Sequence, residues 1–338
     1  MTETAATLSQ VAAHAGVSLA TASRALNGSA RKVNAELQAR VLASAVELGY
    51  SPNVQAQAVA RGTSNTVAIV VGDIADPYFS SIASGVIRVA DERGLMVTIT
   101  ATGTATAEGT DASREAATLA ALRGQRPRVV ILAGSRTVDA RPSHDDGLAQ
   151  LSAIVRGGAS VALIGPNVPG VRSVTVLNRE GATALAVALQ QRGYSDFTIL
   201  AGPENLLTAR DRTSGFLDAA PDARVVPGPF SREGGYETMA ALLAAGDRPG
   251  CVFAVTDVMA VGAMVAMRDA GLTPGTEIAV AGFDDIPLVQ DITPALTTVA
   301  LPLADIGARA LELALAESPD AALTTPFAGV VRLRSSTP

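Results

Sequence analysis

The sequence predicts an all-α head over residues 1–52, a short joining segment over 53–62, and an α/β core of two similar lobes over 63–338. Three observations support this division. The head contains helical apolar patterns and cap signals, short apolar runs alternate with helical patterns in the core, and these runs fall into two successive series. Apolar runs without polar alternation indicate strands buried on both faces, which are typical of parallel sheets covered by helices.

The head begins with two short helices separated by a tight turn. Thr7 and Gln10 have the spacing of a capping box, Gly16 can adopt the positive φ that ends a helix, and Ser18 can cap the second helix. The outward side of that second helix carries small, hydroxylated or cationic residues, namely Leu19, Ala20, Thr21, Ser23 and Arg24. Such a helix can enter the major groove of DNA, although two helices of an ordinary bundle would share the pattern.

A third helix follows Asn34, which can cap it, and its apolar face comprises Leu37, Val41, Ala45 and Leu48. After Pro52, residues 53–60 have room for two helical turns. A helix this short is not stable alone in water. The segment is therefore either a plain linker or a helix that forms only when a partner holds it.

In the core, the predicted strands form a first series at 67–71, 97–100, 129–132 and 161–164, and a second at 174–177, 197–202, 224–226, 251–255 and 278–283. The late elements at 297–302, 303–317 and 330–334 return to complete both lobes. Lobe one is expected to comprise about 66–165 plus 298–319, and lobe two about 166–294 plus 324–338. A ligand is expected outside the carboxyl ends of the strands, between the lobes.

Composition narrows the class of protein. The chain has 338 residues, of which 48% are hydrophobic and only 3% aromatic, so Ala, Val and Leu must fill a large core. No apolar run reaches the roughly 18–20 residues that span a bilayer, so a cytoplasmic protein with no membrane partner is expected. The first 62 residues carry five basic and three acidic side chains, whereas the whole chain has a net charge of −6. This mildly basic head on an acidic body favours DNA contact by the head.

The sequence does not favour an enzyme. His14 and His144 lie far apart in the chain, and the paired carboxylates Asp145/Asp146 and Asp284/Asp285 are chain neighbours whose side chains tend to diverge. Cys251 lies in an apolar run and is expected to be buried in a strand. The sequence contains neither a phosphate-binding loop nor a metal-ligand cluster. No catalytic residue, no metal and no cofactor are therefore predicted.

Seven motifs occur in a characteristic order: AGVSLATASRALNG, LGYSPN, DPYF, RDRTSGF, TDVMAVGAM, GFDD and TPALTTV. Together they resemble the LacI/GalR family of bacterial transcriptional regulators over nearly the whole chain. The resemblance implies a helix-turn-helix head, a hinge helix at 53–62, and a periplasmic-binding-protein-like core of two Rossmann-like parallel-sheet subdomains. It also implies a homodimer, a near-palindromic double-stranded operator, and a small-molecule effector that controls repression.

The resemblance assigns the DNA contacts. Leu19, Ala20 and Arg24 would reach base edges, and Arg24 alone can make a charged bidentate contact. Phosphate contacts would come from Ser18, Thr21, Ser23 and Asn27, with local capping the alternative for Ser23 and Asn27. Tyr50 and Asn53 are also expected to contact DNA. In the hinge, Ala56 would allow two helices to approach closely. Val59 would occupy the position of a leucine wedge, and its shorter β-branched side chain predicts a weaker kink.

For the effector, the resemblance points to a set of core residues, namely Tyr78, Phe79, Arg212, Tyr236, Thr256 and Asp284. Gly165, Thr256 and Leu301 stand where many members have hydrogen-bonding groups. A carbohydrate-related effector is expected, and the alternatives are a ligand less hydroxylated than a hexose, a modified sugar, or no effector in the usual sense. Asp285 is expected to be structural. The alternatives are a solute-binding protein or sensor with the same core, and a regulator with a non-sugar effector.

Overall fold

A computed structural model describes residues 6–27, 33–51, 64–103, 112–134, 142–168, 170–316 and 323–338. The chain forms two compact units, residues 1–64 and 65–338, which correspond to the head and the core. Within the described ranges, no helix is both long and apolar enough to cross a membrane.

The head contains three helices, α1 (Leu8–His14), α2 (Leu19–Asn27) and α3 (Ala35–Glu47). The predicted capping box is confirmed, because the Thr7 side chain accepts from the Gln10 amide and the Gln10 side chain accepts from the Thr7 amide. Gly16 has φ +63°, as a helix-ending residue requires, and the Asn34 side chain caps α3 at 2.9 Å. A small core holds the helices together, formed by Val11, Ala12, Ala15, Ala22, Ala25, Val41 and Ala45.

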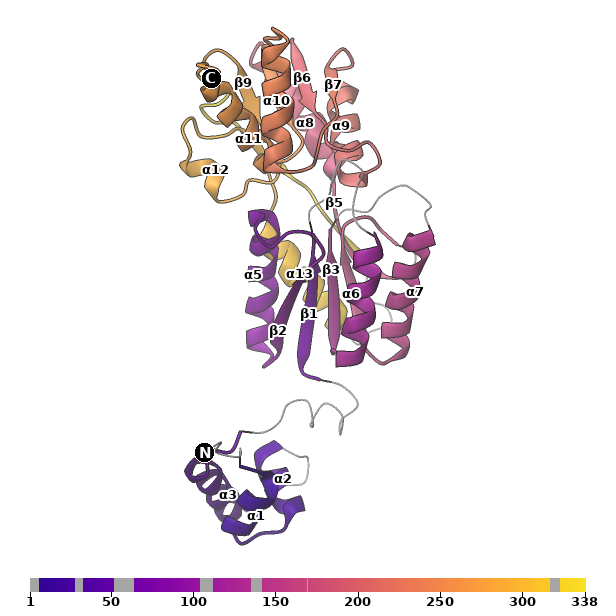
Figure 1. Cartoon of the computed structure of the whole chain (residues 1–338), viewed down its shortest axis with the longest axis vertical. Helices are drawn as coiled ribbons and strands as arrows, with labels where there is room; N and C mark the ends of the chain where they lie inside the picture. The colour runs from indigo at the N-terminus through magenta and orange to yellow at the C-terminus, as the bar shows by residue number, and fades with distance from the viewer. Residues whose placement is uncertain are drawn as a thin grey trace. The chain divides into compact units, whose positions relative to one another are not determined.

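Lobe one is a six-stranded parallel sheet with helices on both faces (Figure 1). The strand order is β11-β5-β4-β3-β1-β2. Its strands are β1 (Thr66–Val71), β2 (Met96–Ala101), β3 (Val129–Ala133), β4 (Ser160–Ile164), β5 (Arg172–Val176) and β11 (Thr324–Phe327). Its helices are α5 (Pro77–Glu92), α6 (Ala112–Gln125), α7 (Pro142–Arg156) and α13 (Leu303–Leu315).

Alternate residues of β1 face opposite layers of helices, which is why its apolar run is continuous. Val67, Ile69 and Val71 pack with the apolar faces of α5 and α13, whereas Ala68 and Val70 pack with those of α6 and α7. All five side chains are at most 1% exposed. The predicted covering of a parallel sheet on both faces is therefore confirmed for this strand.

Lobe two is a four-stranded parallel sheet in the order β7-β6-β8-β9. Its strands are β6 (Phe197–Leu200), β7 (Arg224–Val226), β8 (Cys251–Ala254) and β9 (Ala279–Ala281). Its helices are α8 (Asn178–Gln191), α9 (Leu207–Ala219), α10 (Arg232–Ala244), α11 (Asp257–Asp269) and the short α12 (Leu288–Asp291). Cys251 is completely buried in β8, as the apolar run predicts, and burial raises the pKa of its thiol.

A separate antiparallel pair joins β10 (Thr298–Ala300) to β12 (Val330–Arg332), and both strands contact α8 of lobe two. The chain therefore passes between the lobes at three places: from β5 to α8, from β10 to α13, and from β11 to β12. Because three chain segments join the lobes, the relative motion of the lobes is more constrained than it would be with a single connection.

The predicted lobe boundaries need correction. The strands at 172–176 and 324–327 were expected in lobe two, but both belong to the lobe-one sheet, where β5 pairs with β4 and with β11. Strand 298–300 was expected in lobe one, but it pairs with β12 and packs on α8. An apolar run predicts a buried strand without identifying the sheet edge that it joins, so the sequence pattern could not separate these possibilities.

Close helix packing in lobe one depends on Gly85. A Cβ added to Gly85 in α5 would lie 1.7 Å from the backbone oxygen of Ala304 in α13. We expect Gly85→Ala to lower the free energy of unfolding by about 1–3 kcal/mol, because the two helices must separate. Gly124→Ala in α6 is the matched control, since its added Cβ meets nothing within 4 Å and is expected to stabilise the chain by about 0.5–1 kcal/mol. Equal effects in urea denaturation would contradict this account of the packing.

Candidate functional site

The core contains a cavity of about 440 Å³ between its two lobes. Residues that follow the carboxyl ends of strands in both sheets line it, as the topology of open parallel sheets predicts. Five of the six predicted effector residues lie in its wall, namely Tyr78, Phe79, Arg212, Thr256 and Asp284.

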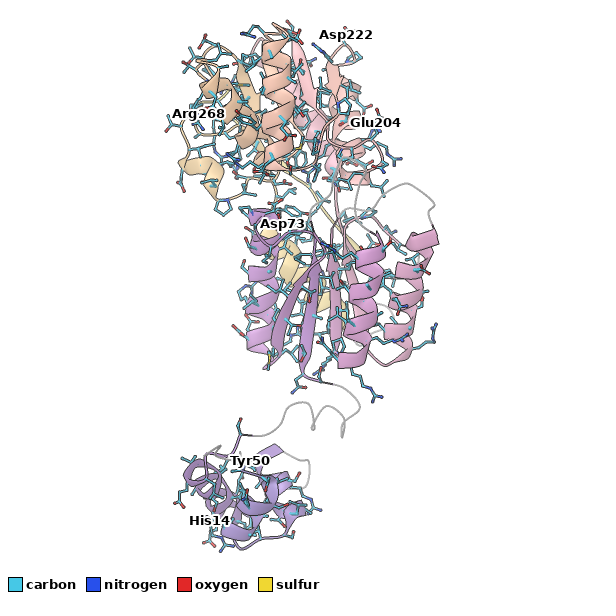
Figure 2. The ribbon with its side chains drawn as sticks, viewed as in Figure 1. His14, Tyr50, Asp73, Glu204, Asp222 and Arg268 are labelled. Atoms are coloured by element: carbon cyan, nitrogen blue, oxygen red, sulfur yellow. The ribbon has the colours of Figure 1, made fainter. Side chains whose placement is uncertain are left out.

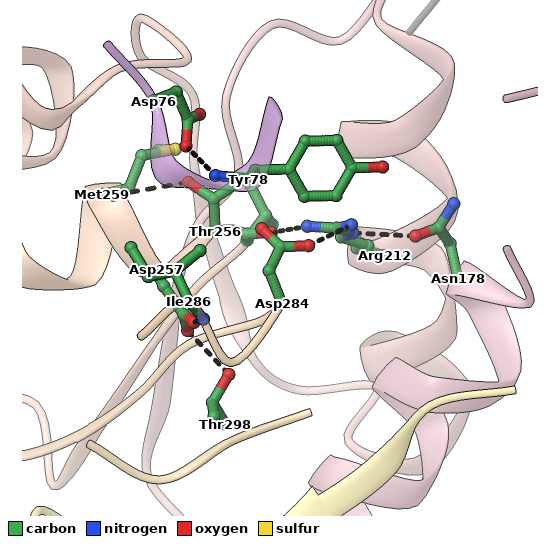
Figure 3. Close-up of polar contacts among 11 residues, drawn as sticks. Asp76, Tyr78, Asn178, Arg212, Thr256, Asp257, Met259, Asp284, Ile286 and Thr298 are labelled. Carbon is green, nitrogen blue, oxygen red and sulfur yellow. Dashed lines mark hydrogen bonds and ion pairs between the residues drawn. The ribbon is translucent and has the colours of Figure 1, made fainter. Parts of the chain in front are cut away.

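Arg212 on α9 is the central polar side chain of this cavity (Figure 3). Its side chain is only 2% exposed, and all three of its nitrogens donate hydrogen bonds. Nη2 donates to Asp284 Oδ1 at 2.7 Å, Nη1 to the Val255 carbonyl at 2.8 Å, and Nε to Asn178 Oδ1 at 2.9 Å. The guanidinium carbon also lies 3.9 Å from the centre of the Phe283 ring, which adds a cation–π contact.

Asp284 lies where the chain leaves β9 and has φ 118°, a region that side-chain-bearing residues rarely adopt. Its backbone is bonded on both sides to the β10 segment, because its N–H donates to Val299 and its carbonyl accepts from Leu301. Burial raises the pKa of its carboxyl, and the positive charge of Arg212 opposes this shift. The neighbouring Asp285 pairs with Arg334 at 2.7 Å, consistent with its expected structural role.

The beginning of α11 forms a second buried polar cluster. Thr256 caps the helix, because its Oγ1 accepts from the Met259 amide at 3.3 Å. The Asp257 carboxylate accepts from Thr298 Oγ1 at 2.6 Å and from the Ile286 amide at 2.9 Å. Burial raises the pKa of Asp257 to about 6. Asp257 thus ties α11 to the β10 segment and to the chain after β9.

Tyr78 and Phe79 approach the cavity from lobe one, at the start of α5. Asp76 caps this helix by accepting from the Tyr78 amide at 2.9 Å, and Pro77 occupies the first helical position, where its missing N–H is not needed. The two rings meet edge to face, with centroids 5.1 Å apart. Burial raises the pKa of the Tyr78 hydroxyl and of the Asp76 carboxyl.

The expectation that Tyr236 forms an aromatic wall is wrong. Its hydroxyl donates to Asp269 Oδ2 at 3.1 Å, which joins α10 to the end of α11, and the residue does not line the cavity. The start of α10 reaches the cavity instead, through residues 231–233, and Phe230 supplies an aromatic ring on this side. Tyr236 lies one helical turn beyond that contact, so its side chain faces the neighbouring helix.

Sequence reasoning also missed several polar residues of the wall, namely Asp73, Asp76, Glu115, Asn178, Thr208, Ser231, Arg232 and Glu233. Most follow the carboxyl end of a strand or begin a helix. That position relative to a predicted strand is the signal that points to them.

The structure gives a setting for two of the positions, Gly165 and Leu301, at which the sequence differs from the family pattern. Gly165 has φ 147°, and an added Cβ would lie 2.7 Å from the Gly134 carbonyl oxygen, so an aspartate there would require the backbone to move. Leu301 is 7% exposed and belongs to the apolar core. Neither residue offers a side-chain hydrogen bond to a ligand.

The head presents the predicted groove-facing side of α2. Leu19 is 52% exposed, and Ala20 and Arg24 are also exposed. Ser18 accepts from the Thr21 amide at 3.2 Å, and the two hydroxyls are 2.8 Å apart, so this pair caps α2. Thr21 and Ser23 are half-buried. The side chain of Asn27 and the predicted contacts Asn53, Ala56 and Val59 lie outside the described residues, as does the 53–62 hinge.

Of the remaining head residues singled out in the sequence, His14 is exposed and contacts α3, whereas Tyr50 is partly buried (Figure 2). His14 Nδ1 lies 3.1 Å from Ser44 Oγ, and its Nε2 lies 3.6 Å from a Glu47 carboxylate oxygen. Tyr50 packs against the small head core while its amide donates to the Ala45 carbonyl. Across the described ranges, no group of three or more potential ligands is arranged to hold a metal ion.

Asp257 predicts a pH dependence of stability. Its pKa is about 6 in the folded chain and about 3.9 when unfolded, so the folded chain holds a proton that the unfolded chain releases between these values. Stability from this group is therefore lost as pH rises from about 4 to 6. Asp257→Asn can still accept from Ile286 and donate to Thr298. Relative to the native chain, its free energy of unfolding should rise by up to about 3 kcal/mol between pH 4 and 7. A pH-independent difference in urea denaturation would reject this.

Comparison with known proteins identifies both units. Residues 7–53 match the family described as bacterial regulatory proteins, lacI family, and residues 186–337 match the periplasmic binding protein-like domain. The regulator GalR of Escherichia coli K12 is 32% identical over 322 residues, which cover 92% of this chain and 89% of GalR. The repressor CytR of the same strain is 31% identical over 321 residues, covering 93% and 90% of the two chains.

Solved structures share the fold over nearly the whole chain. A lac repressor dimer bound to operator and the anti-inducer ONPF has a TM-score of 0.82 at 24% identity, with 99% of each chain covered. A CelR–cellobiose complex has a TM-score of 0.67 at 25% identity and covers 98% of this chain and 99% of that chain. With relatives above 30% identity along almost its full length, the chain belongs to the LacI/GalR family of bacterial transcriptional regulators.

Proposed function

We propose that this regulator is an operator-binding repressor, and that a small molecule in the interlobe cavity controls its affinity for DNA. The observation that carries the proposal is the Arg212–Asp284 pair, held at 2.7 Å in the wall of a cavity to which both lobes contribute. The same chain carries a head whose α2 exposes Leu19 and Arg24. Solute binding alone does not require a helix-turn-helix head of this kind.

The proposed DNA contacts follow from the chemistry of α2. Arg24 donates to a guanine edge in the major groove, and the apolar groups of Leu19 and Ala20 contact thymine methyl groups. Ser18, Thr21, Ser23 and Asn27 position the helix through phosphates, and Tyr50 and Asn53 support the same docking.

We further propose that the chain acts as a homodimer whose two heads read the half-sites of a near-palindromic operator. The 53–62 segments of the two subunits pair as helices in the minor groove, where Ala56 permits close approach and Val59 inserts between base pairs. Because Val59 is a small wedge, specificity at this step depends on how easily the DNA deforms.

The effector bridges the lobes. Tyr78 and Phe79 contact it from lobe one, and Arg212, Thr256 and Asp284 contact it from lobe two. The bound molecule changes the angle between the lobes and hence the ability of the two 53–62 segments to pair. An inducer bound in this way weakens operator binding, and the operator weakens inducer binding by the same factor. The candidate effectors are carbohydrate-related compounds, with a less hydroxylated compound as the second possibility.

Base readout by Arg24 can be tested by gel shift. We expect Arg24→Ala to weaken binding to the operator by about 1–3 kcal/mol, roughly 5- to 150-fold, and to weaken nonspecific DNA binding much less. Arg40→Ala is the matched control, because it removes the same charge from an exposed position on α3. Equal losses on both DNAs for Arg24→Ala, or equal effects of the two variants, would contradict base readout.

Separation of the two modules gives a second test. A chain that lacks residues 1–62 should keep the rise in melting temperature that an effector produces in the full chain, because the cavity is built entirely within residues 65–338. It should also lose operator binding in the gel shift. Loss of the thermal response together with the head would argue against an independent effector domain.

A further inference from the structure

Four glycines form one side of the cavity. Gly72, Gly103, Gly134 and Gly165 occur at equal intervals in the chain, directly after β1, β3 and β4 and just beyond β2, and all four line the cavity. Because glycine has no side chain, the lobe-one wall here consists of main chain. We call these four residues the glycine floor.

A side chain is disfavoured at three positions of the glycine floor, by the positive φ at Gly103 and Gly165, by a backbone overlap at Gly165, and by a tight contact at Gly72. An added Cβ at Gly165 would lie 2.7 Å from a backbone oxygen, at Gly103 2.9 Å from the Arg114 guanidinium, and at Gly72 3.2 Å from the Phe79 ring. Gly134 is different, because its added Cβ meets no atom of the described residues within 4 Å. A side chain at position 134 therefore projects from the floor without overlapping the part of the chain that the structure describes.

The floor offers few donors to a ligand. The amide of Gly103 donates to the Gly72 carbonyl at 2.8 Å, that of Gly134 to Ile164 at 3.2 Å, and that of Gly165 to Val174 at 2.9 Å. The neighbouring lobe-one wall is mainly apolar and includes Val71, Phe79, Leu132, Ala133, Leu163 and Ile164. A wall of main chain that has three of its four amides engaged and apolar groups beside it suits an apolar ring better than a group that needs hydrogen-bond donors.

Lobe two supplies most of the polar side chains of the wall. They are Asn178, Thr208, Arg212, Ser231, Arg232, Glu233, Thr256 and Asp284, and they lie among the apolar residues Leu206, Phe230, Val258, Val261, Ile286 and Leu288. Hydroxyl, amide and carboxylate groups of this kind hydrogen-bond a polar ligand and fix its orientation. The side chains that can orient a polar group are therefore concentrated on the lobe-two side of the cavity.

The charges of the wall disfavour an anion. Among the described wall residues, the cationic side chains are Arg212 and Arg232, and each has a carboxylate partner, Asp284 at 2.7 Å and Glu233 at 3.1 Å. Asp73 and Asp76 add further carboxylates on the lobe-one side. A phosphate or carboxylate on the ligand would meet these negative groups and paired guanidiniums.

We infer that the effector is an uncharged molecule of two parts, a flat apolar ring that lies on the glycine floor and a hydroxyl-bearing part that lobe two binds. This inference rests on the proposed function, because it specifies the ligand of the same cavity. Aryl glycosides and nucleosides share this chemistry, whereas plain hexoses lack the ring and sugar phosphates carry the wrong charge.

The test is a thermal-shift screen of the full-length chain, followed by calorimetric titration. The probes are D-glucose, D-galactose and D-ribose, their phenyl glycosides, adenosine and cytidine, and the corresponding sugar and nucleoside phosphates. We expect at least one ring-bearing neutral compound to bind at least about tenfold more tightly than its parent sugar and than its phosphate.

Gly134→Leu tests the position of the ring. The leucine side chain projects from the floor, so the variant should lose the affinity that the ring adds. Its affinity for the parent sugar should stay unchanged. Gly124→Leu, at an exposed position of α6 where an added Cβ also meets nothing within 4 Å, should leave both affinities unchanged. Melting temperatures without ligand show whether each variant is folded.

Three outcomes overturn the inference. If plain sugars or phosphates bind as tightly as the ring-bearing compounds or more tightly, the ligand class is rejected. If Gly134→Leu lowers the affinity for the ring-bearing compound and for its parent sugar equally, the floor is rejected as the site of the ring. If none of the compounds binds, both the inference and effector control are rejected, while the gel shift still reports DNA binding independently.

Discussion

The buried ion pair of Arg212 and Asp284 constrains the whole core. Both side chains are nearly inaccessible to solvent, so their charges are unfavourable unless every polar atom has a partner. The structure meets this demand with groups from distant segments, namely the Asn178 side chain at the start of α8, the Val255 carbonyl after β8, and the ring of Phe283. The pair therefore ties segments of lobe two together around the cavity, and its bonds reach two of the three interlobe connections, β5–α8 through Asn178 and β10–α13 through Val299 and Leu301.

Close contacts between helices compensate for the scarcity of large side chains in the core. Aromatic residues make up 3% of the chain, so the layers cannot be filled by rings. Helices instead approach at glycines, where an added Cβ would overlap the backbone of the partner helix, as at Gly85 and Gly307 in lobe one and Gly235 and Gly262 in lobe two. Dispersion contacts depend on short distances, so small residues packed closely can replace large ones packed more loosely.

Local signals in the sequence predicted the head well, because caps and helix ends depend on neighbouring residues such as Thr7, Gly16 and Asn34. They also predicted both parallel sheets. They could not assign β5 to its lobe, since an apolar run carries no information about its neighbours in the sheet. The direction of Tyr236 and the role of Asp257 depend on contacts with α11 and β10, which no spacing in the sequence encodes. Family motifs identified Arg212 and Asp284, whereas their partner Asn178 became apparent only in three dimensions.

The division of the cavity between the lobes determines what an effector can do. A ligand shifts an equilibrium between two lobe arrangements only by the difference of its affinities for them. Arg212 is hydrogen-bonded to Asn178, and Thr256 caps α11. Because all three residues belong to lobe two, their proposed contacts with a ligand change little when the lobes move as bodies. The contacts that differ are those made across the cavity by Tyr78, Phe79 and the glycine floor. In the proposed mode of binding, lobe two thus supplies the contacts that both lobe arrangements share, while the fit of the ligand to lobe one sets the size of the regulatory response.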